Sequence, residues 1–232
     1  MIAALLHPSG GLGYHFRAWR YRHTLWAPML DGVAAWLDAW HPPTDRLVLI
    51  GPSAGHTLAR PFLERFDRIT VQEPDPLARR LLDWRLGHQR LRFEAPDALA
   101  SPAGLAHLGK RHAGAAILFC NVLGQVPAPG PGRWSGRLGE ALPGHHWASY
   151  HDVISTRVPP RHTGQVRPAT PEPLESTLAR YWRGGELELV DHETFRLGGN
   201  AEHAYLVWRI TTADYHLIEW VVHAPRPPQP AA

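Results

Sequence analysis

The sequence predicts an α/β protein with a three-layer, doubly wound, mostly parallel sheet of seven strands, one late antiparallel strand and an N-terminal helical segment. Short apolar runs alternate with helical periodicity from about residue 46 to residue 154, which is typical of parallel sheets. The run Ala115–Cys120 is small and apolar throughout, as expected for a strand buried on both faces. Two strand-like runs, 186–190 and 204–210, then follow closely, and they predict an antiparallel addition.

Composition favours one ordinary globular domain. The 232 residues are 19% charged and 44% hydrophobic, and the formal net charge is +3, so neither a nucleic acid nor an acidic ligand is demanded. Cys120 is the only cysteine, which excludes a disulfide framework or a cysteine zinc site within one chain. Residues 1–6 lack the features of a signal peptide, and no apolar run reaches the roughly 20 residues of a membrane span. We therefore expect a soluble, cytoplasmic protein with no membrane partner.

Residues 1–43 are predicted to form a helical cap. Trp36 and Trp40 lie four residues apart on one helical face, and the spacing predicts helices at 14–22 and 27–40. His41-Pro42-Pro43 ends the second helix. The sheet core is expected at 44–224, in the same single domain 1–224, and a disordered proline-rich tail at 225–232.

The elements of the core follow from apolar runs and helix-start signals. We expect strands at 46–50, 69–73, 91–94, 115–120 and 147–154, with helices between them. Asp75-Pro76 and Ser101-Pro102 are cap-then-proline signals that open two of these helices. Helices are expected at 134–142 and 174–182, and the long proline-rich loop 157–173 is of a length typical of functional loops. Residues 215–223 fit either a strand or a short helix.

A glycine turn joins the first strand to the next helix. Gly51-Pro52-Ser53-Ala54-Gly55 follows the first strand, and Glu73 ends the second strand. The order strand, glycine turn, helix, strand and acid suits a nucleotide-type cofactor on a parallel sheet. Gly55 opens the loop because it has no Cβ, and the start of the following helix is expected to offer free N–H groups.

This turn and acid resemble those of class I S-adenosylmethionine-dependent methyltransferases, over about residues 46–210. The resemblance implies a Rossmann-like core that binds S-adenosyl-L-methionine and transfers its methyl group. Carried over by position, it implies these cofactor-binding residues: Gly51, Ser53, Gly55, Glu73 for the ribose hydroxyls, Asp97 for the adenine, and Asn121 beside the methyl group. The chain departs from the family pattern at Ser53, which replaces a glycine, and at Leu49, where many members have an acid.

Residues at the ends of the fourth and fifth strands are candidates to act on the methyl acceptor. Methyl transfer needs alignment and exclusion of water, and a base only when the acceptor must lose a proton. His151 and Asp152 cannot both enter one pocket, because neighbouring residues on a strand face opposite ways. We favour His151, and we expect His151 and Asn121 as the catalytic residues.

The acceptor is expected to be a small molecule rather than a nucleic acid, because no Asn-Pro-Pro-Tyr-like motif follows the fourth strand. Four residues are assigned to its pocket: Tyr14, His15, Trp19 and Gln125. The three aromatic members also fit a core or a partner surface. No metal site is predicted, because the histidines form no HExxH-like set.

Two other classes of protein remain as alternatives. The first is a serine hydrolase, because the turn also fits the nucleophile elbow G-x-S-x-G around Ser53. Asp152 or Asp214 with His216 could complete its triad, but this leaves Glu73 without a role. The second is a non-catalytic module that binds the cofactor or a partner. A phosphate-binding loop lacks its lysine, and the glycine spacing of nicotinamide-binding folds is absent.

Overall fold

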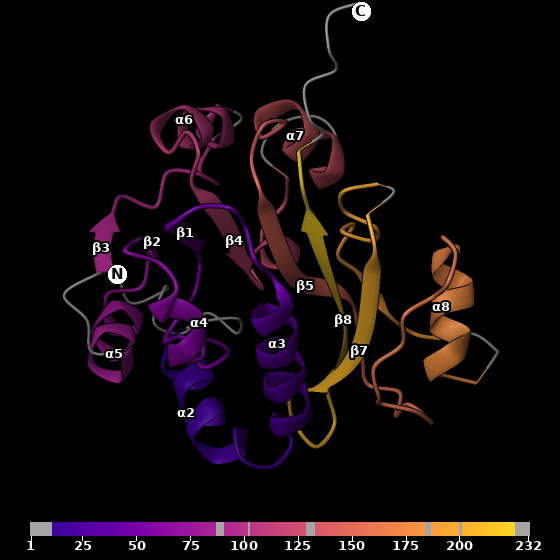
Figure 1. Ribbon diagram of the computed structural model, residues 1–232. Coiled ribbons are helices and arrows are strands. Elements are labelled where there is room, and N and C mark those ends of the chain that lie inside the picture. Colours follow the sequence, from indigo (N-terminus) through magenta and orange to yellow (C-terminus); the bar gives the residue numbers. More distant parts are fainter. Residues whose placement is uncertain are drawn as a thin grey trace, which may run out of the picture.

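The computed structural model describes residues 11–86, 91–101, 103–128, 133–183, 187–199 and 201–225. Within these ranges one sheet runs in the order β3-β2-β1-β4-β5-β8-β7, with β6 paired to β5 (Figure 1). Its strands are β1 (Arg46–Ile50), β2 (Arg68–Gln72), β3 (Leu91–Glu94), β4 (Ala116–Cys120), β5 (Trp147–Thr156), β6 (Val190–Asp191), β7 (His203–Arg209) and β8 (Tyr215–His223). β1 to β5 pair in parallel, whereas β8 is antiparallel to β5 and β7. The predicted doubly wound sheet with a late antiparallel strand is confirmed.

Helices cover both faces of the sheet and make the outer two layers. One face packs against α2 (Gly11–Tyr21), α3 (Ala27–Ala39), α4 (Arg60–Glu64) and α5 (Pro76–Leu86). The other packs against α6 (Gly104–Arg111) and α7 (Trp134–Ala141), and α8 (Leu174–Tyr181) lies beyond β7 at one edge (Figure 1). The described helices include none long and apolar enough to cross a membrane.

The structure of β1 explains why four of its five residues, Leu47 to Ile50, are apolar. Leu47 and Leu49 pack in the core beneath α2 to α5, whereas Val48 and Ile50 pack beneath α6 and α7. Successive side chains alternate between the faces of a strand. Because both faces of this central strand are covered, the side chains of Leu47 to Ile50 are all buried, at roughly 1.5–3 kcal/mol each.

Three local expectations change in the structure. The strand predicted at 186–190 is wrong: β6 has two residues, Val190–Asp191, and residues 184–186 lie outside the described ranges. Past the end of β4, the edge of β5 carries a bulge between Asp152 and Ile154, and only Ile154 and Ser155 pair with β6. The undecided segment 215–223 is strand β8. Of the predicted tail, residues 226–232 lie outside the described part of the chain.

The helix after the glycine turn begins later than expected. Residues 51–59 form turns, and α4 starts at Arg60 with Pro61 in its first turn. Proline fits there because the first helical N–H groups have no partner within the helix. A helix follows the glycine turn as expected. Of the two roles open to Pro61, a kink or the start of the regular helix, the structure shows the second, so the first helical N–H groups lie at Arg60 and beyond rather than at Gly55.

Arg65 holds the end of α3, and we expect Arg65→Met to lower the free energy of unfolding by about 2–3 kcal/mol. Its guanidinium donates to three carbonyls, those of Leu37 (2.7 Å), Asp38 (3.0 Å) and Trp40 (3.0 Å). Carbonyls at a helix end lack the usual i+4 partner, although the Leu37 carbonyl also accepts the Trp40 N–H at 3.2 Å. Hydrogen bonds to charged groups contribute roughly 1.5–3 kcal/mol. Urea unfolding measures the loss. Arg60→Met, which removes one such bond, is the control, and equal losses would contradict this role for Arg65.

Candidate active site

A cavity of about 660 Å³ opens at the carboxyl ends of β1, β4 and β5. Ligands bind at this position in open parallel sheets, and the volume suits a small-molecule ligand. The strand ends contribute Gly51, Pro52, Ser53, Cys120, Asn121, Tyr150 and Asp152. The α2 and α3 segments contribute Tyr14, Arg17, Trp26 and Met29, and the β7–β8 hairpin contributes Trp208, Ile210, Thr211, Asp214 and His216.

The glycine turn and the acid of the second strand meet in space. The Glu73 carboxylate accepts hydrogen bonds from the backbone N–H of Ser53 (2.8 Å) and of Asp75 (2.9 Å). Gly51 and Ser53 have φ angles of +63° and +51°, in the left-handed region. Glu73 is buried, and this burial raises the pKa of its carboxyl although the two N–H donors oppose the shift. The turn and the acid, distant in sequence, thus form one unit.

Buried polar atoms beside this unit have no hydrogen-bond partner. They are both ring nitrogens of His15 and of His56, together with Asp75 Oδ2. The His15 ring lies 6.4 Å from the His56 ring and its Nε2 lies 3.7 Å from Asp75 Oδ2. Burial, with the positive charge of Arg85, lowers the pKa of His56 to about 3, so this ring is neutral. Unpartnered buried polar groups cost roughly 1–3 kcal/mol each, and a polar ligand at this position would relieve that cost.

Asn121 stands at the end of β4 in a strained conformation. Its φ is +51°, a region that costs a residue other than glycine of the order of 1 kcal/mol and that is enriched at functional sites. Its side chain lines the cavity, and its buried Oδ1 has no hydrogen-bond partner. The position suits a residue that contacts a ligand.

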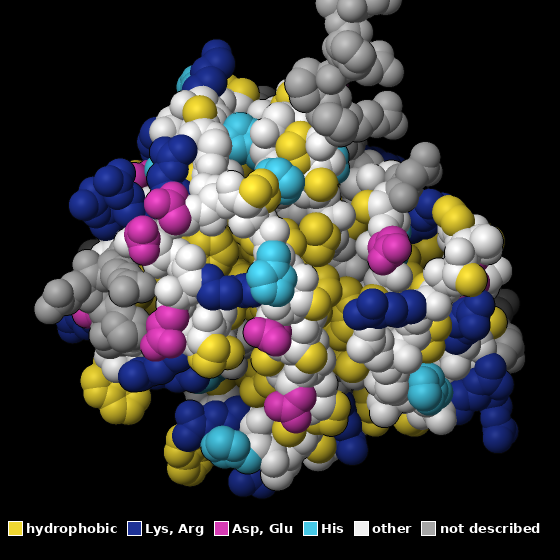
Figure 2. Space-filling model, viewed as in Figure 1, with side chains coloured by type: hydrophobic (Ala, Val, Ile, Leu, Met, Phe, Trp, Pro, Cys, Tyr) yellow, Lys and Arg dark blue, Asp and Glu magenta, His cyan; other side chains and the backbone are white. Residues whose placement is uncertain are grey.

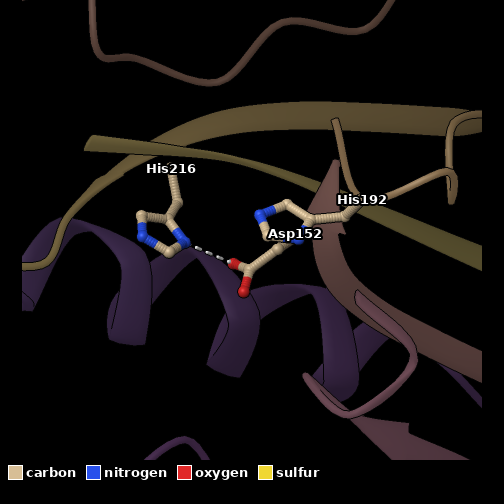
Figure 3. A group of neighbouring side chains, drawn as sticks. All are labelled: Asp152, His192 and His216. Carbon is tan, nitrogen blue, oxygen red and sulfur yellow. Dashed lines mark ion pairs between the residues drawn. The ribbon is translucent and has the colours of Figure 1, made fainter. Parts of the chain in front are cut away.

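A carboxylate and two histidines, Asp152, His192 and His216, lie next to one another (Figure 3), and Asp152 and His216 line the cavity. Asp152 of β5 is fully buried, and its Oδ1 lies 3.1 Å from Nδ1 of His216 on β8. His192, just after β6, lies beside them, and one ligand atom from each of the three residues lies within 4.8 Å of the others. Burial lowers the pKa of His216, but the charge of Asp152, the contact with its carboxylate and the charge of Asp214 together outweigh burial, so the pKa is raised.

The preference for His151 over Asp152 is corrected by the structure. His151 is fully buried on the other face of β5, where Ser149 Oγ (2.9 Å) and the Thr194 carbonyl (3.1 Å) bond its ring. It does not line the cavity, whereas Tyr150 and Asp152 do. Strand alternation brings only one of the two neighbours to the cavity, as expected, and that residue is Asp152 rather than His151.

Of the four residues predicted for the acceptor pocket, two line the cavity and two do not. Tyr14 and Gln125 line the cavity. Trp19 does not: it is 68% exposed, because it shares an outward helical face of α2 with Leu12 and Phe16. His15 also lies off the cavity, against Asp75.

Three predicted cofactor residues do not line the cavity either. Glu73 lies behind the backbone of Ser53. Gly55 packs against α5, where a Cβ would come within 2.5 Å of Leu82 Cδ1. Asp97 pairs with Arg111 at 2.9 Å, which lowers the pKa of its carboxyl.

The hydrolase alternative loses support. Ser53 and His216 line the same cavity, but no hydrogen bond among the described residues joins the Ser53 side chain to a histidine. A nucleophile elbow also places its serine directly between a strand and a helix, whereas α4 begins only at Arg60.

Comparisons with known proteins return distant structural matches. No protein-family model and no curated protein matches the chain. Among solved structures, it is similar to the N-terminal domain of EvdMO1 with SAH bound (17% identity, TM-score 0.43, 85% of this chain and 81% of that one). It is also similar to the N-methyltransferase NodS from Bradyrhizobium japonicum WM9 in complex with S-adenosyl-L-homocysteine (14%, 0.42, 95% and 95%). A third is the Burkholderia thailandensis 1,6-didemethyltoxoflavin-N1-methyltransferase (17%, 0.40, 84% and 78%). At these low values the matches carry no functional argument, so the function must be inferred from this chain's own residues.

Proposed function

We propose that this protein is an S-adenosylmethionine-dependent methyltransferase that acts on a small molecule. The observation that carries the proposal is the unit formed by the Gly51–Ser53 turn and Glu73, with unpartnered buried polar atoms beside it. Glu73 retains acceptor capacity for ribose hydroxyls, because each carboxylate oxygen accepts one backbone bond and has further lone pairs. His15, His56 and Asp75 supply polar atoms for the nucleoside, and Asn121 supplies one at the cavity.

The cavity walls suit transfer of a methyl group. S-adenosylmethionine, when bound, supplies an electrophilic methyl group to the acceptor. The chain must align the two molecules and exclude water. Trp26, Met29 and Trp208 form apolar walls, and Trp26 is fixed by a 2.9 Å bond from its Nε1 to the Ile210 carbonyl. Beside these apolar walls, Asn121 and Asp152 provide polar groups at the strand ends.

Charge and volume favour a small acceptor. The cavity has the volume of a small-molecule site. Figure 2 shows Lys and Arg side chains scattered over the visible face and interspersed with Asp and Glu. A nucleic-acid substrate would favour a continuous basic surface.

Calorimetric titration with S-adenosylhomocysteine tests the proposal. We expect a micromolar dissociation constant and no binding of a nicotinamide cofactor run in parallel. Absence of S-adenosylhomocysteine binding by the folded protein would contradict the proposal. Binding without methyl transfer to any component of a metabolite extract would support the non-catalytic module instead.

A further inference from the structure

We propose that Asp152, His192 and His216 bind a divalent transition-metal ion at the wall of the cavity. The residues come from β5, from the segment after β6 and from β8, and their side chains lie next to one another, with one ligand atom of each within 4.8 Å of the others (Figure 3). Asp152 Oδ1 and His216 Nδ1 are 3.1 Å apart. Metal bonds to N and O of about 2.0–2.2 Å, set near a right angle, place adjacent ligand atoms about 3 Å apart. The spacing therefore fits two neighbouring ligands of one ion.

One oxygen of the Asp152 carboxylate is held by side-chain amides, and the other faces the histidines. Its Oδ2 accepts from the side-chain amides of Gln125 and, at 3.5 Å, of Asn121. Its buried Oδ1 faces His216 Nδ1 at 3.1 Å, which is an ion pair when that ring is protonated. Because the side chain is fully buried, its negative charge needs a cation beside it. A metal ion between Oδ1 and the two histidines would take the place of the His216 proton.

Neighbouring side chains orient the two histidines. His192 Nε2 lies 3.2 Å from Ser155 Oγ, within hydrogen-bond distance. Such a contact helps to fix the ring orientation of a histidine at many metal sites. His216 Nδ1 faces Asp152 Oδ1 at 3.1 Å. Hydrogen bonds of the chain therefore hold Asp152 and His192, and the ion pair with Asp152 orients His216.

The ligand set selects the class of ion. Two imidazoles and one carboxylate suit zinc, iron, cobalt, nickel or manganese, whereas magnesium and calcium prefer oxygen ligands only. Three protein ligands leave further positions open to another molecule. Asp152 and His216 line the cavity, so an oxygen or nitrogen of a bound molecule can reach the ion. The sequence gives no such indication, because the three residues share no short motif.

The site is joined to the region of the methyl acceptor. Asn121 and Gln125, which hold Asp152 Oδ2, both line the cavity. A metal ion there would bind the acceptor atom and ease its deprotonation as a Lewis acid. This role rests on the proposed methyl transfer, whereas metal binding itself does not.

Metal titration of the full chain, prepared without a histidine tag, tests the site. Protein stripped with a chelator is titrated with Co²⁺, whose visible absorption reports coordination, and bound zinc is counted after desalting. We expect one equivalent per chain in the wild type. Asp152→Asn, His192→Gln and His216→Gln should each weaken binding by more than tenfold. His107→Gln, at an exposed histidine on α6, should bind as the wild type does.

Absence of a bound equivalent, or unchanged binding by Asp152→Asn, would overturn the metal site. If Asp152→Asn fails to fold, His192→Gln gives the same test from a partly exposed position. The metal site would also be overturned if a chelator leaves methyl transfer unchanged while His216→Gln abolishes it. Asp152 and His216 would then act as an acid–base pair. S-adenosylhomocysteine titrations of the stripped protein keep the two proposals apart. A protein that binds S-adenosylhomocysteine but takes up no metal ion overturns only the metal site. A protein that takes up a metal ion but does not bind S-adenosylhomocysteine overturns only the proposed function.

Discussion

Replacing Glu73 with glutamine is expected to weaken S-adenosylhomocysteine binding by at least tenfold, about 1.4 kcal/mol. Both carboxylate oxygens accept backbone N–H groups, from Ser53 and from Asp75. An amide must turn its NH₂ group toward one of these donors, so one of the two bonds is lost. Hydrogen bonds from ribose hydroxyls to a charged acceptor are also stronger than those to a neutral one. Calorimetry gives the affinity, and thermal unfolding identifies the fraction that remains folded.

Glu94→Gln is the matched control for this prediction. Glu94 ends the neighbouring strand β3 as Glu73 follows β2, but it pairs with Arg111 and His112, away from the glycine turn. Its replacement should leave the affinity unchanged. Equal affinities of the wild type and a folded Glu73→Gln variant would remove Glu73 from the cofactor site and with it the main support for methyl transfer.

Elements with strong local signals were predictable from the sequence. The apolar run 116–120 is β4, and Asp75-Pro76 opens α5, where Asp75 Oδ1 accepts the N–H of Leu77 at 2.8 Å. The pairing of Glu73 with the glycine turn also follows, because adjacent parallel strands end at the same edge. These features depend on short stretches of chain or on the order of neighbouring strands.

The remaining features of the site depend on long-range register. Which of His151 and Asp152 faces the cavity is set by the side of the sheet on which α2 and α3 pack, and no local pattern encodes it. His192 joins Asp152 because the segment at β6 pairs with β5 beyond the bulge. His216 arrives only because β8 runs antiparallel beside β5, where it is paired with Ser155. The carboxylate and histidine cluster therefore could not be read from spacing.

Gly55→Ala is expected to lower the free energy of unfolding by about 2–4 kcal/mol. Gly55 has φ +66°, and an added Cβ would lie 2.5 Å from Leu82 Cδ1 and 3.1 Å from Leu86 Cδ1. The left-handed conformation costs an L-residue roughly 1–2 kcal/mol, and overpacking a core typically costs 1–3 kcal/mol. Urea unfolding measures the change. Gly136→Ala in the exposed part of α7, where nothing lies near the new Cβ, should stabilise the protein by about 0.5–1 kcal/mol.

A double-mutant cycle shows whether packing, rather than ligand approach, requires a glycine at position 55. Leu82 is fully buried on α5, so Leu82→Ala alone should cost roughly 2–5 kcal/mol. In the double variant the new methyl group fills part of the space that Leu82 leaves. The combined loss should therefore fall short of the sum by about 1 kcal/mol or more, as residues in contact often do. Additive losses, or a Gly55→Ala variant of normal stability that has lost affinity for S-adenosylhomocysteine, would instead assign Gly55 to the ligand, as the glycine pattern alone suggests.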